Sequence, residues 1–315
     1  MSTFGARARE LMAEQGVSLR ALSRRTFYDV GHLSRVLNGR KPPSAELARK
    51  VDAELGADGR LAALADERLS QAAENPRRVD AEVLDSVAAM LAVTRRLEDA
   101  TSASSVYPTV RTYMAMVERF AAEAKAAVRP AAVGLASELH QYAGWLSVPM
   151  RRWSTAERML DRAVVLGLEA GDPLRTTLAL SFSAYTAMRR GDLRRADALS
   201  EASIRDDHVD AGLRTYTVYQ RAEILARAGE RTAAYRLLNE ADTMVDHLPA
   251  ADELSDSGYW YTPAFFRGNH AFVLAKLGEH VAAKRMMAES LAALPDEWRT
   301  SEWAERRRAF ADSSD

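Results

Sequence analysis

The sequence predicts an all-α protein, built as a compact helical bundle followed by a solenoid of helical hairpins. Ala, Leu, Arg and Glu, all good helix formers, dominate the 315 residues, and runs of β-branched residues are scarce. Apolar residues recur at helical spacing from the N-terminus onward, and small residues recur in four related segments further along. A chain of this length predicts about two domains, which we place at residues 1–70 and 81–315, with a linker at 71–80.

Residues 1–70 have the apolar spacing and the turn residues of a small helical bundle. The expected helices span residues 3–15, 18–26, 29–38 and 44–55. The last three begin at capping residues, which are Ser18, Asp29 and Ser44. Gly39 stands where a left-handed residue ends a helix, and Pro42–Pro43 follow where a helix cannot continue. The second and third helices are too short to bury their apolar stripes alone, so they are expected to pack across each other.

Within this bundle, residues 16–43 resemble a helix-turn-helix of the Cro/repressor class, also called the xenobiotic-response-element class. The resemblance rests on the capped helices and on apolar residues such as Leu22, Leu33 and Leu37. It implies that duplex DNA is a partner and that the second helix of the motif enters the major groove. Residues 18–50 agree, because they hold eight Arg or Lys against two acids in a chain of net charge −1. The alternative is an ordinary bundle with a solvated basic face.

The resemblance assigns roles to individual positions of the motif. Its base readers correspond to Val30, Gly31 and Arg35, with His32 and Ser34 beside them. Arg35 suits a bidentate contact with guanine, and Val30 suits contact with a thymine methyl group. Gly31 lets the backbone approach a base or phosphate closely. The alternative role of His32 is that of a half-buried spacer. The expected phosphate contacts are Ser18, Arg20, Arg24, Asn38, Arg40 and Lys41.

Two positions of the motif depart from the family pattern. Leu19 stands where Gln is frequent, and this change weakens one phosphate contact. Phe27 stands at the turn position, where Gly is frequent. A bulky residue at that place predicts a less tight turn, with Phe27 or Tyr28 packed inward.

Between residues 131 and 294, four segments share three small residues at fixed spacing. The central residues are Ala156, Ala196, Ala234 and Ala283; Gly144, Ala184, Ala222 and Ala271 stand twelve positions before them, and Ala163, Ser203, Ala241 and Ser290 seven after. Small residues are needed where the two helices of a hairpin approach closely. The segments resemble tetratricopeptide repeats, with intervals of 40, 38 and 49 residues instead of about 34. The alternative is an irregular α-helical bundle.

In tetratricopeptide repeats the first helix of each hairpin lines the concave face, so the resemblance predicts an effector site there. The expected effector-binding residues are Gln141, Trp145, Tyr185, Arg189, Tyr216, Tyr219, Gln220, Glu223, Arg227, Asn269, Phe272 and Lys276. Aromatic rings cover apolar side chains, amides hold backbone groups and cations meet a carboxylate, which suits a peptide or a similar small effector. The alternative is that the aromatic residues pack the solenoid and the cations face water.

The segments on either side of the repeats are expected to shield their ends. Residues 79–127 carry two long amphipathic patterns, the first running from Val83 to Leu97, and are expected to include the contact of a homodimer. Residues 295–315 predict a charged terminal helix that caps the last hairpin.

Composition and motifs exclude several other classes of function. The chain has no Cys, which excludes disulfides and thiolate chemistry and fits a cytoplasmic protein. It has no run of about 18 apolar residues and no signal-peptide core, so no membrane partner is expected. Phosphate loops, zinc motifs and catalytic triads do not occur, and the His residues are scattered. Acidic pairs such as Glu98–Asp99 and Asp206–Asp207 are interpreted as solvated helix ends. An enzyme, a metal site and a cofactor are therefore not expected.

Together the two parts resemble bacterial regulators of this architecture and the peptide-pheromone receptors of Gram-positive bacteria. The resemblance implies a homodimeric, sequence-specific transcriptional regulator whose repeat region binds a peptide or small effector and thereby changes DNA binding. One alternative is a DNA-binding regulator whose repeats dock a protein partner, of the sigma-factor or antitoxin type, without a small ligand. Another is an enzyme carried by a DNA-targeting module.

Overall fold

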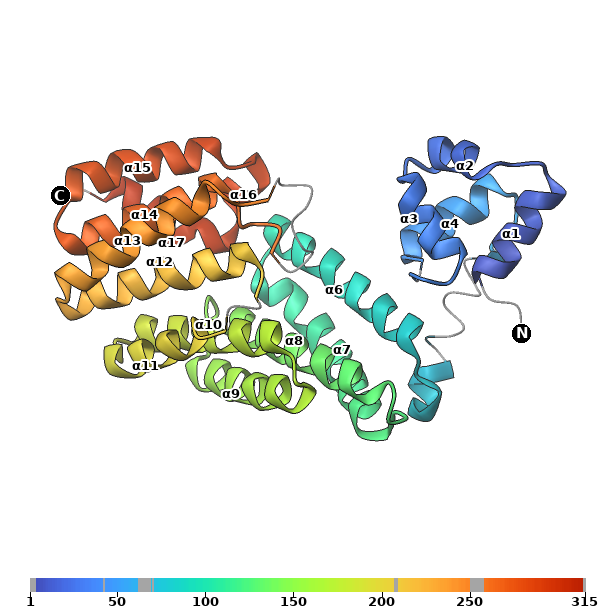
Figure 1. Cartoon of the computed structure of the whole chain (residues 1–315), viewed down its shortest axis with the longest axis horizontal. Helices are drawn as coiled ribbons and strands as arrows, with labels where there is room; N and C mark the ends of the chain where they lie inside the picture. The colour runs from blue at the N-terminus through green and yellow to red at the C-terminus, as the bar shows by residue number, and fades with distance from the viewer. Residues whose placement is uncertain are drawn as a thin grey trace. The chain divides into compact units, whose positions relative to one another are not determined.

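The computed structural model of the chain describes residues 4–41, 43–61, 69, 71–206, 209–249 and 258–313. Within these ranges every regular element is a helix, which confirms the predicted all-α class (Figure 1). The chain forms two compact units, one made of residues up to 93 together with 115–135, the other made of 94–114 together with the residues from 136 onward. The linker expected at 71–80 stays a prediction. Among the described helices, none combines the length and apolar character that crossing a bilayer requires.

The described part of the N-terminal bundle contains four helices up to residue 54: α1 (Phe4–Glu14), α2 (Leu19–Thr26), α3 (Val30–Leu37) and α4 (Ala45–Glu54). Each end lies within one residue of its predicted position. The bundle closes around fully buried leucines, with Leu22 from α2, Leu33 from α3 and Leu47 from α4. The short helices therefore bury their apolar stripes against one another, as their length requires.

The predicted caps hold three of these helices in place. Ser18 Oγ accepts a hydrogen bond from the Ala21 amide at 3.2 Å, at the start of α2. Asp29 Oδ1 accepts one from the His32 amide at 2.9 Å, at the start of α3. Ser44 caps α4 in the same way, and Gly39 has the left-handed backbone (φ +69°) expected after α3. Pro42 of the predicted helix stop lies outside the described residues.

The turn between α2 and α3 corrects the expectation for Phe27. This residue adopts the left-handed backbone that Gly prefers, with φ +60°, and its side chain is 90% exposed. The turn is therefore tight, and Phe27 does not pack inward. Two interactions fix it: Ser23 Oγ donates a hydrogen bond to the Tyr28 carbonyl at 2.6 Å, and the Tyr28 side chain packs partly against the bundle core. A β-carbon in the left-handed region costs about 1–2 kcal/mol, which these contacts must offset.

Two long helices follow a short 3-10 turn, η1 (Pro76–Arg78). They are α6 (Ala81–Ala100) and α7 (Ala103–Glu123), as the amphipathic patterns predict. Leu97, expected on the inner face of α6, is instead exposed, as is Val93 one turn earlier. The buried stripe of α6 turns away from Leu97 because the last turn of this helix buries Glu98 and Asp99 instead.

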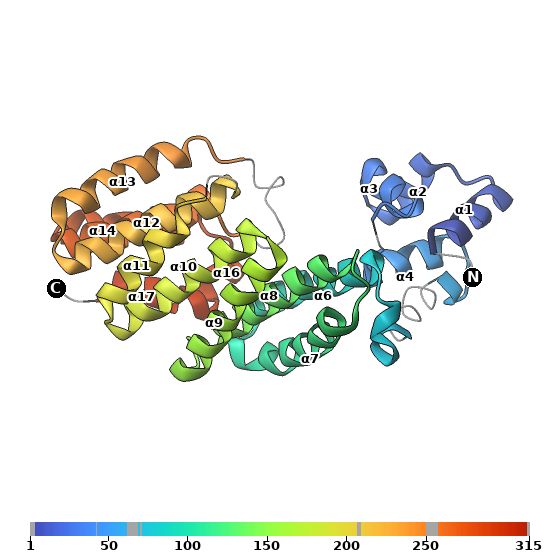
Figure 2. The ribbon, with the colours of Figure 1, turned by 60° about the horizontal axis from the view of Figure 1, so that its bottom comes forward.

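Four helical hairpins follow (Figures 1 and 2): α8 (Arg129–Ser147) with α9 (Trp153–Ala170), α10 (Pro173–Arg190) with α11 (Leu193–Ser203), α12 (Ala211–Ala228) with α13 (Arg231–Val245), and α14 (Pro263–Leu277) with α15 (His280–Ala293). All twelve small residues identified in the sequence are buried, one set of three in each hairpin. A β-carbon on Gly144 would lie 2.6 Å from Leu160 Cγ, so this crossing of α8 and α9 requires glycine. The predicted hairpin solenoid is confirmed.

The turn between the two helices of a hairpin differs between the first repeat and the other three. Gly191, Gly229 and Gly278 end α10, α12 and α14 with φ between 85° and 91°. Glycine adopts this backbone without a steric cost. The first hairpin has Arg151 with φ +55° at its turn instead.

The C-terminal segment comprises α16 (Asp296–Thr300), η3 (Glu302–Ala304) and α17 (Glu305–Asp312). Helix α17 packs against α15 and so covers the last hairpin, as expected of a cap. It is not simply a solvated charged helix, because the Arg307 side chain is buried and Phe310 contacts Phe272 of α14, with ring centroids 5.8 Å apart.

Candidate functional site

The first candidate site is the outer face of α3 in the N-terminal bundle. Leu33, Val36 and Leu37 are buried, so α3 turns its other side, which carries Arg35, to solvent. A β-carbon on Gly31 would lie 3.7 Å from Arg35 Nη1, so the glycine leaves the surface beside this guanidinium free of side-chain atoms. All eleven residues expected to contact DNA keep some exposure in the structure. The arrangement presents a guanidinium fork on an accessible helix, as base recognition requires.

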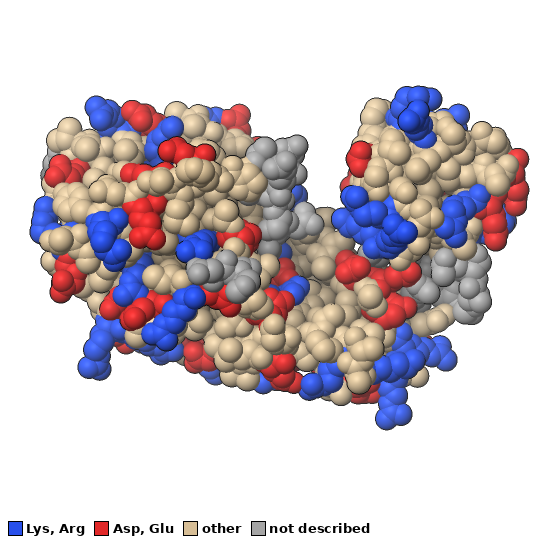
Figure 3. Space-filling view, viewed as in Figure 1, with Lys and Arg blue, Asp and Glu red and all other residues tan. Residues whose placement is uncertain are grey.

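Basic side chains surround this face. In the space-filling view, Lys and Arg gather over α2 and beside the end of α3 (Figure 3). Sequence reasoning missed one member, Arg9 of α1, whose Nη1 donates a hydrogen bond to Asn38 Oδ1 at 2.8 Å. The neighbouring Arg7 pairs with Glu10 at 2.8 Å, whereas Arg9 reaches the end of α3. The signal was the position of Arg9 on the solvent side of α1, which becomes meaningful only once α1 is packed beside α3.

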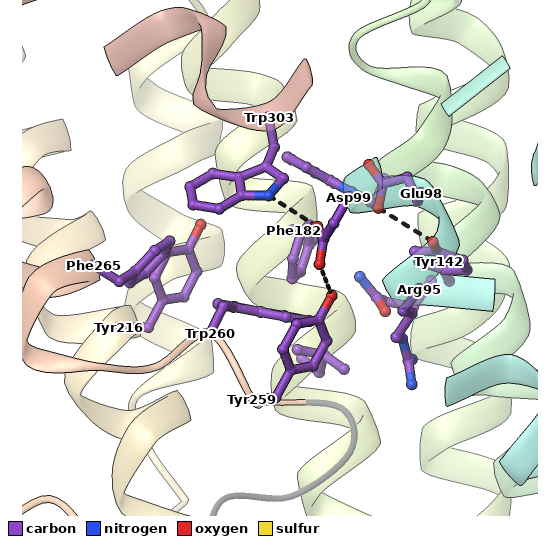
Figure 4. A pocket seen from close by; sticks show the side chains of 13 residues that line it. Arg95, Glu98, Asp99, Tyr142, Phe182, Tyr216, Tyr259, Trp260, Phe265 and Trp303 are labelled. Atoms are coloured by element: carbon purple, nitrogen blue, oxygen red, sulfur yellow. Dashed lines mark hydrogen bonds between the residues drawn. The ribbon is translucent and has the colours of Figure 1, made fainter. Parts of the chain in front are cut away.

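The second candidate site is a cavity in the compact unit that contains the hairpins, here called the repeat unit. The space inside it, counted out to its opening to solvent, is about 610 Å³, and the first helices of the hairpins bound it (Figure 4). Eight aromatic rings line it, those of Tyr142, Trp145, Phe182, Tyr216, Tyr259, Trp260, Phe265 and Trp303. Leu178 and Gln141 complete the helical wall, and the end of α6 supplies Arg95, Glu98 and Asp99. A mostly apolar cavity with a few polar groups on one side is the usual composition of a small-molecule site.

Two buried carboxylates form the polar side of this cavity. Glu98 is 5% exposed and accepts a hydrogen bond from Tyr142 Oη at 3.2 Å. Asp99 is 7% exposed and accepts from Trp303 Nε1 at 2.9 Å and from Tyr259 Oη. Burial, reinforced by the neighbouring Asp99, raises the pKa of Glu98 to about 8, and burial also raises the pKa of Asp99. The interpretation of Glu98–Asp99 as a solvated helix end is wrong, because the last turn of α6 faces the cavity.

Among the described residues, the one basic member of the cavity wall is Arg95, and a different carboxylate engages it. Its Nη2 lies 3.0 Å from Glu138 Oε1, and the other oxygen of Glu138 lies 2.9 Å from Arg175 Nη2. Burial alone raises the pKa of Glu138, but the two arginines outweigh it and hold that pKa below its ordinary value. Glu138 thus remains ionised and pairs with Arg95, so Glu98 and Asp99 give the cavity an acidic side that Arg95 does not neutralise.

A second cavity, of about 570 Å³, adjoins the first and shares Trp145, Tyr216, Phe265 and Trp303 with it. Side chains of the C-terminal segment line this second cavity. Arg307 donates to the Phe265 carbonyl at 3.0 Å and to Asn269 Oδ1 at 2.7 Å. Arg306 pairs with the buried Glu223. A β-carbon on Gly268 would collide with the Arg307 guanidinium, so glycine at this position makes room for it.

The comparisons with known proteins bear on the first site. Residues 3–65 match the model of a helix-turn-helix domain. The chain carries a helix-turn-helix domain. This confirms the motif predicted from residues 16–43. Among solved structures, the chain is similar to the crystal structure of Bacillus thuringiensis PlcR in complex with the peptide PapR7 and DNA, with 12% identity, a TM-score of 0.48, and coverage of 99% of this chain and 100% of that chain. None of the curated proteins matches this chain.

The structure gathers nine of the twelve expected effector residues around the two cavities: Gln141, Trp145, Tyr185, Tyr216, Tyr219, Gln220, Glu223, Asn269 and Phe272. The three expected cations lie outside both cavities. Arg189 donates to Tyr185 Oη at 2.7 Å, Arg227 pairs with Glu223 at 2.8 Å, and Lys276 is exposed. The cations that do line the second cavity, Arg306 and Arg307, come from the segment expected to be only a cap.

Two further features of the cavities differ from a simple ligand groove. Tyr219 is a core residue: it stacks on Phe266 with ring centroids 5.6 Å apart and donates to Asp242 at 2.5 Å. Its packing follows the alternative in which aromatic residues fill the solenoid. The cavity residues Tyr259, Trp260 and Trp303 were not predicted from the sequence, because they lie outside the repeat pattern. The run of aromatic residues at 259–261 was the one sequence signal that pointed to two of them.

Proposed function

We propose that this protein is a sequence-specific transcriptional regulator that binds duplex DNA through α3 and changes this binding in response to an effector held by the repeat unit. The observation that carries the proposal is the helix-turn-helix domain, in which α3, the second helix of the motif, exposes Arg35 on a basic face (Figure 3). Arg35 reads guanine through two parallel hydrogen bonds, and Val30 covers a thymine methyl group. The expected phosphate contacts, together with Arg9, hold backbone phosphates on both sides of α3; they are Ser18, Arg20, Arg24, Asn38, Arg40 and Lys41.

The proposed working form is a homodimer on a two-fold site. One domain of this size buries little DNA surface, so useful specificity requires two half-sites about one helical turn or a multiple of it apart. Helix α6 offers a surface for the contact, because Val93 and Leu97 are 65% and 52% exposed on successive turns. Apolar side chains at that spacing form one stripe, as in paired helices.

The proposed effector, a peptide or small molecule, occupies the cavities on the side of the first helices. The cavities are preformed and largely aromatic, which reduces the cost of ordering a ligand. For a tenfold change in operator affinity, the ligand must favour one conformation by about 1.4 kcal/mol, and DNA must change ligand affinity by the same factor. Small rotations between hairpins are the conformational change that a solenoid offers most readily.

Selection of duplexes from a random pool with the full chain tests the DNA-binding claim. We expect enrichment of one motif with two symmetric half-sites, bound with an affinity that falls steeply as salt rises. A matched pool incubated with a variant lacking the guanidinium, Arg35→Ala, should lose the preference at one base pair of each half-site. Recovery of unrelated sequences by the wild-type chain would contradict the proposal.

A further inference from the structure

The wall of the 610 Å³ cavity holds two buried carboxyl groups that have no cation of the wall as partner among the described residues. Of its charged wall residues, Glu98 and Asp99 are acidic, and Arg95 is bound to Glu138. Other acidic groups, Glu297 and Glu302, add to the negative field at these two carboxylates. A carboxylate out of water is costly unless a charge of opposite sign lies near it.

One further cation lies near this wall without entering the cavity. Arg96 stacks on Tyr259, with Cζ 4.6 Å from the ring centroid, and its charge acts on Asp99. Arg96 is not among the residues that line the cavity, and its own side chain is exposed. In the part of the chain that the structure describes, the inner side of the carboxyl pair therefore faces aromatic rings and, of the guanidinium groups, only that of Arg95, which Glu138 holds.

The rings supply the other half of a cation site. Figure 4 shows Trp260, Trp303, Tyr259 and Phe265 around the space beside Asp99. The face of an aromatic ring is negative, and Trp attracts a cation most strongly. Such an attraction is stronger away from water, and the apolar body of a ligand gains further from leaving water.

The neighbouring cavity shows the same chemistry with a cation already in place. There, the Arg306 guanidinium lies over the Phe272 ring and pairs with the buried Glu223. Ring and carboxylate thus hold one of the chain's own cations in the second cavity. The first cavity combines rings and carboxyl groups in the same way, and its own guanidinium, that of Arg95, lies over the Tyr142 ring and is paired with Glu138.

We propose that the 610 Å³ cavity binds a small organic cation, an amine or quaternary ammonium with an apolar body, whose charge rests against Glu98 and Asp99 among the rings of Trp145, Trp260 and Trp303. That this cation is the effector rests on the proposed function; that it binds does not.

Tryptophan fluorescence of the full chain measures this binding directly, because three of the five Trp residues line the cavity. The probe is benzyltrimethylammonium. Phenylmethanesulfonate is an anion of similar shape, and benzyl alcohol is a neutral comparison. We expect saturable quenching by the cation, with a Kd at least tenfold lower than that of either comparison. Equal affinities, or no saturable change with the cation, would overturn the proposal.

Variants that remove a carboxylate charge but keep the size of the side chain test whether Glu98 and Asp99 hold the cation. At pH 8.5, where Glu98 is mostly ionised, Glu98→Gln and Asp99→Asn should each weaken cation binding at least tenfold. Glu289→Gln, on the exposed side of α15, should leave it unchanged. Undiminished cation binding in the double variant Glu98→Gln/Asp99→Asn would also overturn the proposal. If either variant loses its circular dichroism spectrum, the comparison of cation and anion on the wild-type chain decides alone.

Titration of the same preparation with duplex DNA separates the two proposals. Cation binding without salt-sensitive DNA binding would support the proposed cation site and contradict the proposed function as a DNA-binding regulator. DNA binding without cation binding would sustain the regulator and remove the cavity assignment.

Discussion

The Arg306 guanidinium lies over the ring of Phe272, with its central carbon 3.7 Å from the ring centroid. This contact joins the C-terminal segment to α14 and brings a cation onto the side of the repeats where an effector was expected. A ligand that extends along all four hairpins would have to displace this segment. A ligand confined to the first cavity would not.

Removing the buried Arg307 should destabilise the repeat unit. Arg307→Ala leaves the Phe265 carbonyl and Asn269 without their donor and empties space between three rings. We expect a loss of about 2–3 kcal/mol in the free energy of unfolding, measured by urea denaturation with tryptophan fluorescence. Gly268→Ala should have an effect of the same sign, because its methyl group displaces this guanidinium. A control, Arg285→Ala on the exposed face of α15, should change stability little. A loss below about 0.5 kcal/mol for both test variants would contradict the packing described.

What the sequence predicted well was local. The small residues of the hairpins and the caps Ser18 and Asp29 act within one helix or one hairpin, so spacing reveals them. The run Arg306–Arg308 carries no such signal. Its burial depends on Glu223, 83 positions earlier, and on Asn269, 38 positions earlier. Only the folded chain brings these groups together.

The acidic wall escaped prediction for a related reason. Two adjacent carboxylates at a helix end are usually solvated, and nothing near Glu98 in the sequence indicates otherwise. Their environment is built by Tyr142, Tyr259 and Trp303, which come from distant parts of the chain. The expectation of a less tight turn at Phe27 was wrong for a different reason. The backbone of Phe27 adopts the left-handed conformation that Gly prefers, although a residue with a β-carbon disfavours it.

Stability should depend on pH through Glu98. The pKa of this carboxyl rises from 4.5 to about 8 on folding, so the folded state binds its proton more tightly than the unfolded state. The associated stability is therefore complete below about pH 4.5 and is lost as pH rises toward 8. Glu98→Gln removes this dependence. Relative to wild type, the variant should gain up to about 1.4 kcal/mol per pH unit between these limits, in urea denaturation series at several pH values. Glu289→Gln is the matched control, and parallel profiles for Glu98→Gln and wild type would refute this assignment.

Replacing Phe27 with glycine should stabilise the N-terminal bundle. Phe27→Gly removes the strain of a β-carbon at φ +60°, and the exposed ring contributes little burial. We expect the amides of α2 and α3 to gain about 0.5–1 kcal/mol of protection in hydrogen exchange. Ala13→Gly in the exposed part of α1 provides the contrast, because glycine there should cost about 1 kcal/mol. Weaker protection in Phe27→Gly would mean that the ring holds the turn.

The affinity of the cavity for an organic cation should rise as the pH rises. Because the protonated form of Glu98 predominates below about pH 8, an entering cation must displace that proton. Benzyltrimethylammonium should therefore bind several-fold more tightly at pH 8.5 than at pH 6.5, in fluorescence titrations of the wild-type chain. With Glu98→Gln this gain should largely vanish; a gain of equal size would assign it to another group.

The most direct test of DNA reading by α3 compares two arginines on the selected operator. Arg35→Ala should weaken binding by about 1–3 kcal/mol and abolish the preference at one base pair of each half-site. Arg40→Ala should weaken all sequences alike and reduce the slope of log K against log salt by about 0.9 for each domain bound. Competition titrations with every single-base variant of the operator resolve both effects. If Arg35→Ala left affinity and base preference unchanged, α3 would not be the helix that reads DNA, and the proposed mode of operator recognition would be wrong.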